Sequence, residues 1–208
     1  MGYLEDGNVV SAELTYDRQK TGILLIGDSI RLGYCSTVRE QLADAANVFY
    51  PAENCRNSQY VITKLCAWSK EYPADEIKLI QFNCGHWDVA HWNGYETSLT
   101  SPDEYRRNIQ MIICLLRKLF PNAKLVFATT TAMNPDGSVG VNPRNNKEIA
   151  LYNSIAVKVA EEFDVVINDL NGITSTYGAE MFRDYCHLTA AGFEELGKAV
   201  AGFLRKML

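Results

Sequence analysis

Short apolar runs alternate with longer amphipathic segments along nearly the whole chain, and this alternation constrains the fold more than any other feature. Five apolar runs resemble buried strands, at residues 23–26, 48–50, 77–82, 125–129 and 165–167. Helical patterns lie between and after them, at residues 30–45, 58–70, 103–120, 146–163 and about 190–206. Because parallel strands need crossover connections, the sequence predicts an α/β fold whose five-stranded, mostly parallel sheet is covered on both faces.

Length and charge narrow the class of protein. The 208 residues fit a single domain spanning 1–208, and the polar, turn-rich stretch at 132–145 is expected to be a loop within it. A net charge of −5 gives no electrostatic footprint for nucleic acid, so we expect no nucleic-acid partner. The sequence leaves the oligomeric state open.

Targeting signals also give expectations. No apolar stretch approaches the roughly 18 residues that span a bilayer, so no membrane span is expected. The segment Met1–Asp6 has neither a basic start nor a hydrophobic run behind it, as an export signal would have. The sequence predicts a soluble protein, cytoplasmic as given, or secreted or periplasmic if a signal peptide was trimmed.

The cysteines do not form a metal-binding or disulfide pattern. There are six, with no CxxC pair and no zinc-like spacing: Cys35, Cys55, Cys66, Cys84, Cys114 and Cys186. We expect free thiols that are mostly buried.

The end of the first apolar run has the composition of a reactive turn. Gly27, Asp28 and Ser29 follow it directly, at the carboxyl edge where open α/β sheets place their ligand clefts. Glycine permits a tight turn there, and Ser29 could act as a nucleophile. The same three residues could instead simply cap the following helix, since Asp and Ser are both good capping residues.

A second polar group lies near the end of the chain. Asp184 and His187 are three residues apart, a spacing that projects both side chains to one side of a turn. The carboxylate could then fix the tautomer of the imidazole while the second ring nitrogen faces a serine across a cleft. Separately, each residue could be an ordinary surface acid or a locally hydrogen-bonded histidine.

Together, Gly27-Asp28-Ser29 and Asp184-x-x-His187-Leu188-Thr189 resemble the SGNH, or GDSL-type, hydrolases, a family of esterases and lipases. The resemblance spans nearly the whole chain. It implies a three-layer α/β/α, flavodoxin-like sandwich in which Ser29 is the nucleophile, His187 the general base and Asp184 the orienting acid. It implies no metal and no organic cofactor. The α/β-hydrolase motif G-x-S-x-G fits less well, because Arg31 occupies the position of its second glycine.

The two middle blocks of the family, which supply its oxyanion hole, match loosely. The third block usually reads Gly-x-Asn-Asp, but this chain has Trp87 in the asparagine position. We therefore expect the amide of Asn83, at the end of the third strand, to donate to the oxyanion. The second block has no glycine, so a backbone N–H of Arg56 or Asn57 is expected instead. The N–H of Ser29, at the start of a helix, would be the third donor.

The stretch after the third strand is expected to line a substrate pocket. The expected pocket residues are Asp28, Gly85, His86, Trp87 and Trp92. The two tryptophans would form walls for an acyl group or a sugar ring, although they could equally be core aromatics. The polar loop from Asn134 to Asn146, with Arg144, could cover the cleft, bind substrate or be a plain surface loop.

The residues of the same region could also support two other kinds of chemistry. A metal site would use His86, Asp88 and His91, but its spacing matches no zinc motif. A cysteine nucleophile would be Cys84 or Cys186, yet Cys186 is adjacent to His187 in sequence and neighbouring side chains do not normally face each other.

The sequence thus predicts a serine esterase that removes a small acyl group, most plausibly acetyl from a carbohydrate. The expected partner is a small-molecule or carbohydrate ester. The preference for carbohydrate rests on the family resemblance alone. Two alternatives stay open: a glycan- or acyl-binding module with weak or no turnover, and a thioesterase or lysophospholipase that uses the same residues.

Overall fold

The protein is described by a computed structural model covering residues 16–208. The segment Met1–Asp6, on which the expectation about an export signal rests, lies outside these residues. The strands are β1 (Thr21–Ile26), β2 (Ala46–Phe49), β3 (Ile77–Phe82), β4 (Lys124–Ala128) and β5 (Val166–Asn168). The helices are α1 (Ser29–Gln41), α2 (Ser58–Glu71), α3 (Pro102–Leu119), α4 (Asn146–Glu162), α5 (Leu170–Thr174) and α6 (Ala190–Arg205), with short 3-10 helices η1 (Trp92–Gly94) and η2 (Ala179–Met181).

All five strands pair in parallel, in the order β2-β1-β3-β4-β5. The chain adds β2 on one side of β1 and then returns to add β3, β4 and β5 on the other. The order of the strands therefore reverses at β1, and the loops after β1 and β3 diverge there. A cleft at the carboxyl ends of these two strands is the usual ligand site of such a sheet.

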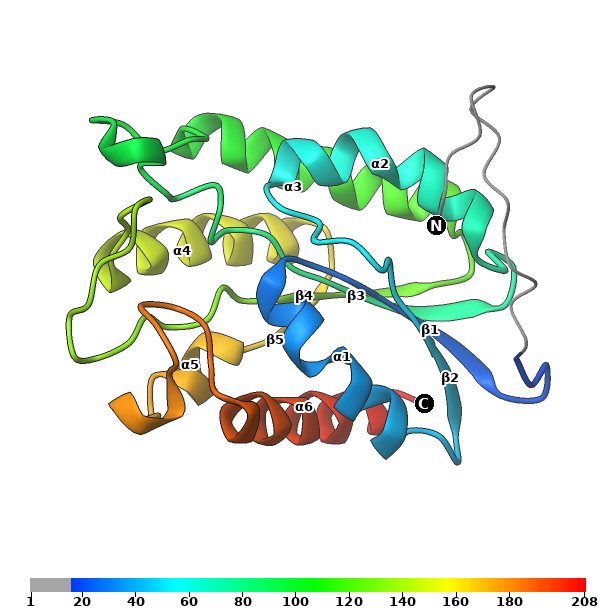
Figure 1. Cartoon of the computed structure of the whole chain (residues 1–208). Coiled ribbons are helices and arrows are strands. Elements are labelled where there is room, and N and C mark those ends of the chain that lie inside the picture. Colours follow the sequence, from blue (N-terminus) through cyan, green and yellow to red (C-terminus); the bar gives the residue numbers. More distant parts are fainter. Residues whose placement is uncertain (1–15) are drawn as a thin grey trace, which may run out of the picture.

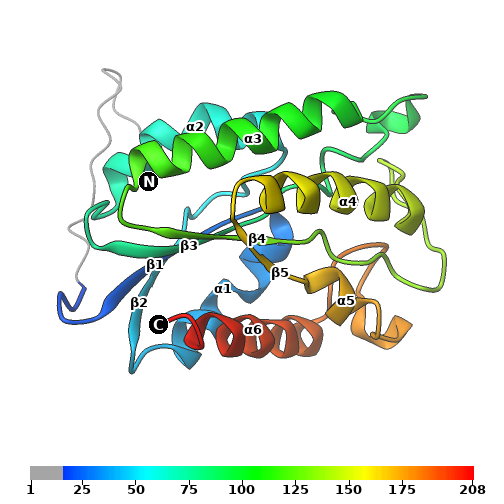
Figure 2. The same ribbon diagram turned by 180° about the vertical axis from the view of Figure 1, so that it is seen from behind.

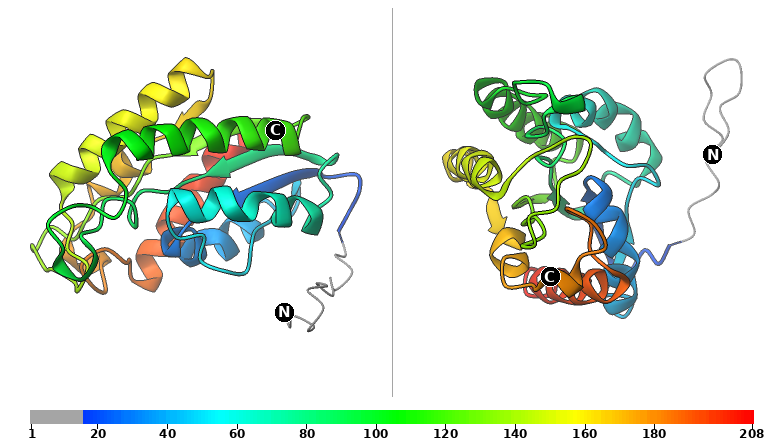
Figure 3. Two further views of the ribbon diagram at one scale, coloured as in Figure 1. Left: turned by 90° about the horizontal axis from the view of Figure 1, so that it is seen from above. Right: turned by 60° about the vertical axis from the view of Figure 1, so that its left-hand side comes forward.

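Helices cover both faces of the sheet (Figure 1). The helices α2, α3 and α4 lie over one face, and α1 and α6 lie over the other, with the short α5 beside α6; the view from behind shows the same layers (Figure 2). Each layer buries its own apolar cluster, the first centred on residues such as Leu65, Ile109 and Ile149 and the second on Tyr34, Val38 and Leu196. Figure 3 shows the same layers from above and after a turn of 60° about the vertical axis.

The predicted order of elements is confirmed, and most boundaries agree within one to three residues. The helix predicted at 30–45 ends earlier, at Gln41, because a turn follows and β2 already begins at Ala46. Residues 132–145 form a loop, as predicted. The helix α5 was not predicted, because five residues are too few to show a helical period; the Asp169 side chain caps it by accepting from the N–H of Gly172.

Helix starts follow local sequence signals. At α3, the Ser101 side chain accepts from the N–H of Glu104, and the Glu104 carboxylate accepts from the N–H of Ser101, which forms a capping box with Pro102 at the first position. All six cysteines are free thiols, four of them buried, while Cys66 and Cys114 are exposed. Among residues 16–208, no helix is both long and apolar enough to cross a membrane.

Candidate active site

The turn after β1 leaves no room for a side chain at its first residue. A Cβ atom on Gly27 would lie 2.0 Å from Asn83 Oδ1 and 2.8 Å from the Cβ of Arg31. The Asp28 side chain accepts from the N–H of Ile30 at 2.9 Å and so caps α1. Ser29 is thereby held as the first residue of α1, at the carboxyl edge of the sheet, where the positive end of the helix dipole is found.

A fully buried arginine fixes this turn from behind. The guanidinium of Arg31 donates to the carbonyl oxygens of Gly27 at 3.1 Å, Pro51 at 2.8 Å and Glu53 at 2.6 Å. These bonds tie the turn after β1 to the loop after β2. Arg31 therefore satisfies three buried or partly buried carbonyl groups at once, which are costly to leave unpaired.

The segment that carries Asp184 and His187 is a closed turn in front of α6. Phe182 and Leu188 form an antiparallel bridge, and the N–H of Arg183 donates to the carbonyl of His187 at 2.9 Å. Inside the turn, Asp184 Oδ1 accepts from the N–H of Cys186 at 2.9 Å and of His187 at 2.7 Å. The carboxylate is thus oriented by backbone before it reaches the imidazole ring.

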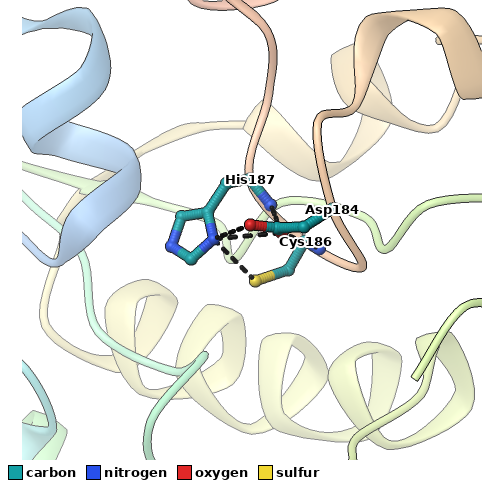
Figure 4. Close-up of side chains that lie close together, drawn as sticks. All are labelled: Asp184, Cys186 and His187. Atoms are coloured by element: carbon teal, nitrogen blue, oxygen red, sulfur yellow. Dashed lines mark hydrogen bonds and ion pairs between the residues drawn. The ribbon is translucent and has the colours of Figure 1, made fainter. Parts of the chain in front are cut away.

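Three side chains from the two ends of the described chain form one hydrogen-bonded series. His187 Nδ1 lies 2.9 Å from Asp184 Oδ2, and His187 Nε2 lies 2.9 Å from Ser29 Oγ. Figure 4 shows Asp184 and Cys186 on the Nδ1 side of the ring, with the other nitrogen directed away from them. An ionised carboxylate only accepts, so it selects the tautomer with the proton on Nδ1, and Nε2 is left to accept from the serine hydroxyl.

The surroundings keep Asp184 ionised. Burial alone would raise the pKa of Asp184, but the N–H groups of Cys186 and His187 and the His187 ring outweigh it and lower the pKa below its usual value.

The two thiols next to the site, those of Cys186 and Cys84, have raised pKa values. Cys186 Sγ is 3.6 Å from His187 Nδ1, the nitrogen that already faces Asp184, and burial raises the pKa of this thiol to about 12. Burial also raises the pKa of Cys84 well above its usual range. Because the thiolate is the reactive form, neither cysteine has the environment of a nucleophile.

A cleft of about 240 Å³ opens at Ser29 and His187. Larger hollows of about 570 Å³ and 590 Å³ lie elsewhere on the surface, but neither includes Ser29. The residues lining the cleft are Ser29, Asn54, His86, Trp87, Trp92, Asn142, Arg144, Tyr185, Cys186 and His187. The indole rings of Trp87 and Trp92 lie against each other, with centroids 5.0 Å apart and planes tilted by 31°, and they form one aromatic wall.

The wall is held by contacts outside the cleft. His91 Nε2 lies 2.7 Å from a carboxylate oxygen of Glu148 at the start of α4, and His91 Nδ1 lies 2.9 Å from the carbonyl of Tyr95. The bond with Glu148 is the main reason that the pKa of His91 is raised. This pair fixes the short segment that carries Trp92, a role for His91 that the sequence did not indicate.

The structure does not bring the residues of the metal hypothesis together. His86 Nε2 lies 2.9 Å from Thr131 Oγ1, whereas Asp88 accepts from the N–H and the hydroxyl of Ser58 and His91 faces Glu148. Burial, followed by the charges of Arg144 and His187, holds the pKa of His86 well below its usual value. Within residues 16–208, the three-residue grouping of potential ligands is instead Asp184, Cys186 and His187.

The side chains and N–H groups expected to donate to the oxyanion lie in different surroundings. The Asn83 side chain is buried against Gly27 and does not line the cleft. The Arg56 N–H donates to Asn54 Oδ1 at 2.8 Å in an Asx turn, and Arg56 has a positive φ of 53°. The side chain of Asn57 accepts from the N–H of Tyr60 and caps α2. Donation to the oxyanion by Ser29, by Asn83 and by Arg56 or Asn57 stays a prediction.

Two expected pocket residues lie outside the cleft lining. Asp28 is fully buried beneath the turn, because its carboxylate caps α1 from inside. Gly85 has a φ of 153°, and a Cβ there would lie 2.0 Å from Thr130 Oγ1, so this residue provides close packing and no pocket surface.

The sequence missed three lining residues, Asn54, Asn142 and Tyr185. Two of them had a local signal, since Asn54 lies two residues before Arg56, an expected oxyanion donor, and Tyr185 lies inside the Asp184–His187 turn. Asn142 comes from the loop after β4, whose several possible roles the sequence could not separate. The structure gives that loop a place along the cleft through Asn142 and Arg144.

Comparisons with known proteins add information on the fold. No family model matches the chain, and no curated protein matches it. Solved structures do match. An acetyl xylan esterase has a TM-score of 0.71 and 19% identity, and the match covers 88% of this chain and 99% of that chain. A lipase/acylhydrolase from Enterococcus faecalis has a TM-score of 0.70 and 18% identity over 90% of this chain and 97% of that chain, and a carbohydrate acetylesterase from Sinorhizobium meliloti has a TM-score of 0.68 and 15% identity over 91% and 100% of the two chains. The expected α/β fold, with a five-stranded parallel sheet covered by helices on both faces, is confirmed, and these structures share it.

Proposed function

We propose that the protein is a serine hydrolase that cleaves a small acyl ester through Ser29, His187 and Asp184. The observation that carries this proposal is the series of 2.9 Å contacts from Ser29 Oγ through the His187 ring to Asp184, at the mouth of a cleft. A serine hydroxyl becomes a useful nucleophile only when a base accepts its proton, and this geometry supplies that base in the required tautomer.

In this mechanism Ser29 Oγ attacks the ester carbonyl while His187 Nε2 takes the hydroxyl proton. The imidazolium that forms is stabilised by the Asp184 carboxylate, and it then gives its proton to the leaving alcohol. Water repeats the cycle on the acyl-enzyme, with His187 again acting as the base and Ser29 as the leaving group. This chemistry needs no metal and no organic cofactor.

The tetrahedral intermediate carries a negative oxygen that needs donors. The backbone N–H of Ser29 is at the amino end of α1, where the helix leaves its first N–H groups without internal partners. The side-chain NH2 group of Asn83, whose Oδ1 faces Gly27, is the second donor in this proposal. A backbone N–H of Arg56 or Asn57 is the third.

The substrate proposed is an O-acetyl ester of a carbohydrate. A cleft of about 240 Å³ is smaller than typical sites for drug-sized ligands, which supports a short acyl group over a long lipid chain. The paired indoles of Trp87 and Trp92 provide a flat apolar surface suited to the face of a sugar ring. Two of the similar structures are an acetyl xylan esterase and a carbohydrate acetylesterase, which makes this substrate class the natural first choice.

The test is hydrolysis of 4-nitrophenyl acetate by the wild type and by Ser29→Ala, followed by acetate release from acetylated xylan fragments. We expect the variant to lose nearly all turnover. An organophosphate should label the wild type at Ser29. Equal activity of both proteins, or labelling at another residue, would show that the nucleophile is misassigned. Measurable glycan binding without Ser29-dependent turnover would favour the binding-module alternative.

Two further expectations stay predictions. One domain spanning residues 1–208 is consistent with the single sheet, but residues 1–15 lie outside the description. The cellular compartment is likewise a prediction from the sequence.

A further inference from the structure

The described residues that line the cleft include one positively charged side chain and no carboxylate. Arg144 is the only arginine or lysine among the lining residues, and no Asp or Glu is among them within the described part of the chain. This contrasts with the chain as a whole, which has a net charge of −5. A cation placed where the substrate binds, in an otherwise acidic protein, is the pattern of electrostatic complementarity to an anionic ligand.

The three hydrogen bonds of Arg144 all go to neutral groups. Its Nε donates to the carbonyl of Asn142 at 3.3 Å, Nη1 donates to the carbonyl of His86, and Nη2 donates to the hydroxyl of Tyr185 at 3.3 Å. Its guanidinium also lies 5.4 Å from the centroid of the Tyr185 ring. Within residues 16–208, Arg144 forms no ion pair with an acid.

These bonds hold the guanidinium in place without using all its donors. A guanidinium has five N–H donors, and the three bonds above leave one on each terminal nitrogen. Two such donors can make the parallel bonds with which arginine binds a carboxylate. The side chain is therefore ordered in advance, which lowers the entropic cost of binding an anion.

The charge of Arg144 changes the pKa of several groups around the cleft. It lowers the pKa of His86, after the larger effect of burial, and it opposes the rise that burial produces in the pKa of Cys186. It also opposes the rise in the pKa of Asp28, the nearby acid that is fully buried beneath the turn. Asp184, the other acid at the site, faces the far side of the His187 ring and pairs with Arg183.

We propose that Arg144 is a specificity-determining residue that binds a carboxylate of the substrate, so that the preferred ester is an acetylated acidic sugar such as a hexuronic acid. This inference rests on the proposed function and narrows its substrate class. The aromatic wall of Trp87 and Trp92 would contact the ring, and the guanidinium would bind the carboxylate on that ring.

The experiment compares two isosteric esters, a mono-O-acetyl methyl hexuronoside and the corresponding hexuronamide, whose carboxylate is replaced by a neutral amide. We expect the wild type to release acetate from the acid with a kcat/KM about 10- to 100-fold higher, the range expected for a hydrogen-bonded charge pair. In Arg144→Met the ratio should fall to about one. Arg144→Lys should keep part of the preference, because lysine retains the charge but not the planar fork.

Controls separate recognition from structural support. Lys147→Met removes an exposed cation three residues along the chain and should leave the ratio at its wild-type value. If Arg144 only supports the cleft wall, Arg144→Met will lower turnover of the acid and the amide equally, and the proposal is then wrong. A wild-type ratio near one would also overturn it.

A measurement on the wild type alone tests the proposal even if the variants do not fold or the acetylated sugars are not hydrolysed. The unacetylated hexuronoside should inhibit hydrolysis of 4-nitrophenyl acetate at least about 10-fold more strongly than the hexuronamide. Equal inhibition would count against the carboxylate. Failure of the proposed function itself gives a different result, namely ester hydrolysis that persists in Ser29→Ala.

Discussion

His187 Nε2 lies 2.9 Å from Ser29 Oγ, although 158 positions separate the two residues in the chain. Both residues are held by local structure before they meet. Ser29 begins α1 after a two-residue turn that follows β1, and His187 belongs to a turn closed by the Phe182–Leu188 bridge in front of α6. Because α1 and α6 cover the same face of the sheet, their amino ends bring the hydroxyl and the imidazole to one edge (Figure 1).

The contact between His187 and Asp184 predicts the effect of Asp184→Asn. The asparagine would keep an oxygen for the N–H groups of Cys186 and His187, but its amide would donate to Nδ1 and force the ring proton onto Nε2. In that tautomer His187 cannot accept the Ser29 proton. We expect kcat to fall by about 10,000-fold with little loss of stability, measured with 4-nitrophenyl acetate.

The matched control for this change is Asp136→Asn, which alters an exposed acid in the loop after β4 and should leave kcat unchanged. A loss of less than about tenfold in Asp184→Asn would mean that the carboxylate does not set the tautomer.

A pair of asparagine variants locates the oxyanion donor. The Asn83 side chain is buried with its Oδ1 facing Gly27, two residues before the nucleophile, whereas the Asn54 side chain lines the open cleft. If Asn83 donates to the oxyanion, Asn83→Ala should lower kcat by about 100- to 1,000-fold and change KM little. Asn54→Ala should mainly raise KM.

Steady-state kinetics on 4-nitrophenyl acetate distinguish the two amides, and thermal melts check that both variants are folded. The reverse pattern, with the large loss of kcat in Asn54→Ala, would transfer the donor role to Asn54.

The sequence was sufficient to predict the order and type of the five strands and of the five long helices, because the strands are short apolar runs and the helices are longer amphipathic segments. It also identified Ser29, Asp184 and His187 as candidates, since short motifs with fixed spacing carry them. The order of the strands in the sheet could not be predicted from the sequence, because it depends on the pairing of β1 with β3, which no local sequence pattern indicates. The position of Arg144 was likewise undetermined, because its bonds to His86 and Tyr185 span 58 and 41 positions.

Arg31 illustrates how a local motif can hide a structural role. From the sequence it was only the residue that breaks the G-x-S-x-G pattern, yet in the structure it is fully buried and satisfies the carbonyl groups of Gly27, Pro51 and Glu53. These partners are known only once the loop after β2 is placed beside the turn after β1.

This arrangement predicts a large stability loss for Arg31→Met. The methionine fills part of the space but removes the guanidinium from all three carbonyl groups. The Gly27 carbonyl keeps the N–H of Cys55, whereas the carbonyls of Pro51 and Glu53 lose their N–H donor, so the free energy of unfolding should fall by about 3 kcal/mol or more. Arg106→Met is the matched control. Arg106 forms an exposed pair with Glu162 at 2.7 Å, and its loss should cost at most about 1 kcal/mol. Urea denaturation measures both changes, and equal losses would contradict the role given to Arg31.

Buried Asp88 predicts a specific pH dependence of stability. Burial raises its pKa to about 6, although the N–H and hydroxyl of Ser58 both donate to it. Between about pH 3.8 and pH 6 the folded protein therefore keeps a proton that the unfolded chain has already released. Raising the pH through this window should destabilise the wild type relative to Asp88→Asn, by up to about 3 kcal/mol for a difference of about two pKa units.

The measurement is the free energy of unfolding of both proteins from urea titrations between pH 4 and 7.5. The wild-type value minus the variant value should fall as the pH rises to about 6 and then stay level. Most other titrating groups are common to the two proteins and largely cancel in this difference. A difference that rises with pH would mean that the hydrogen bonds from Ser58 outweigh burial and that the carboxylate is the favoured form in the folded protein.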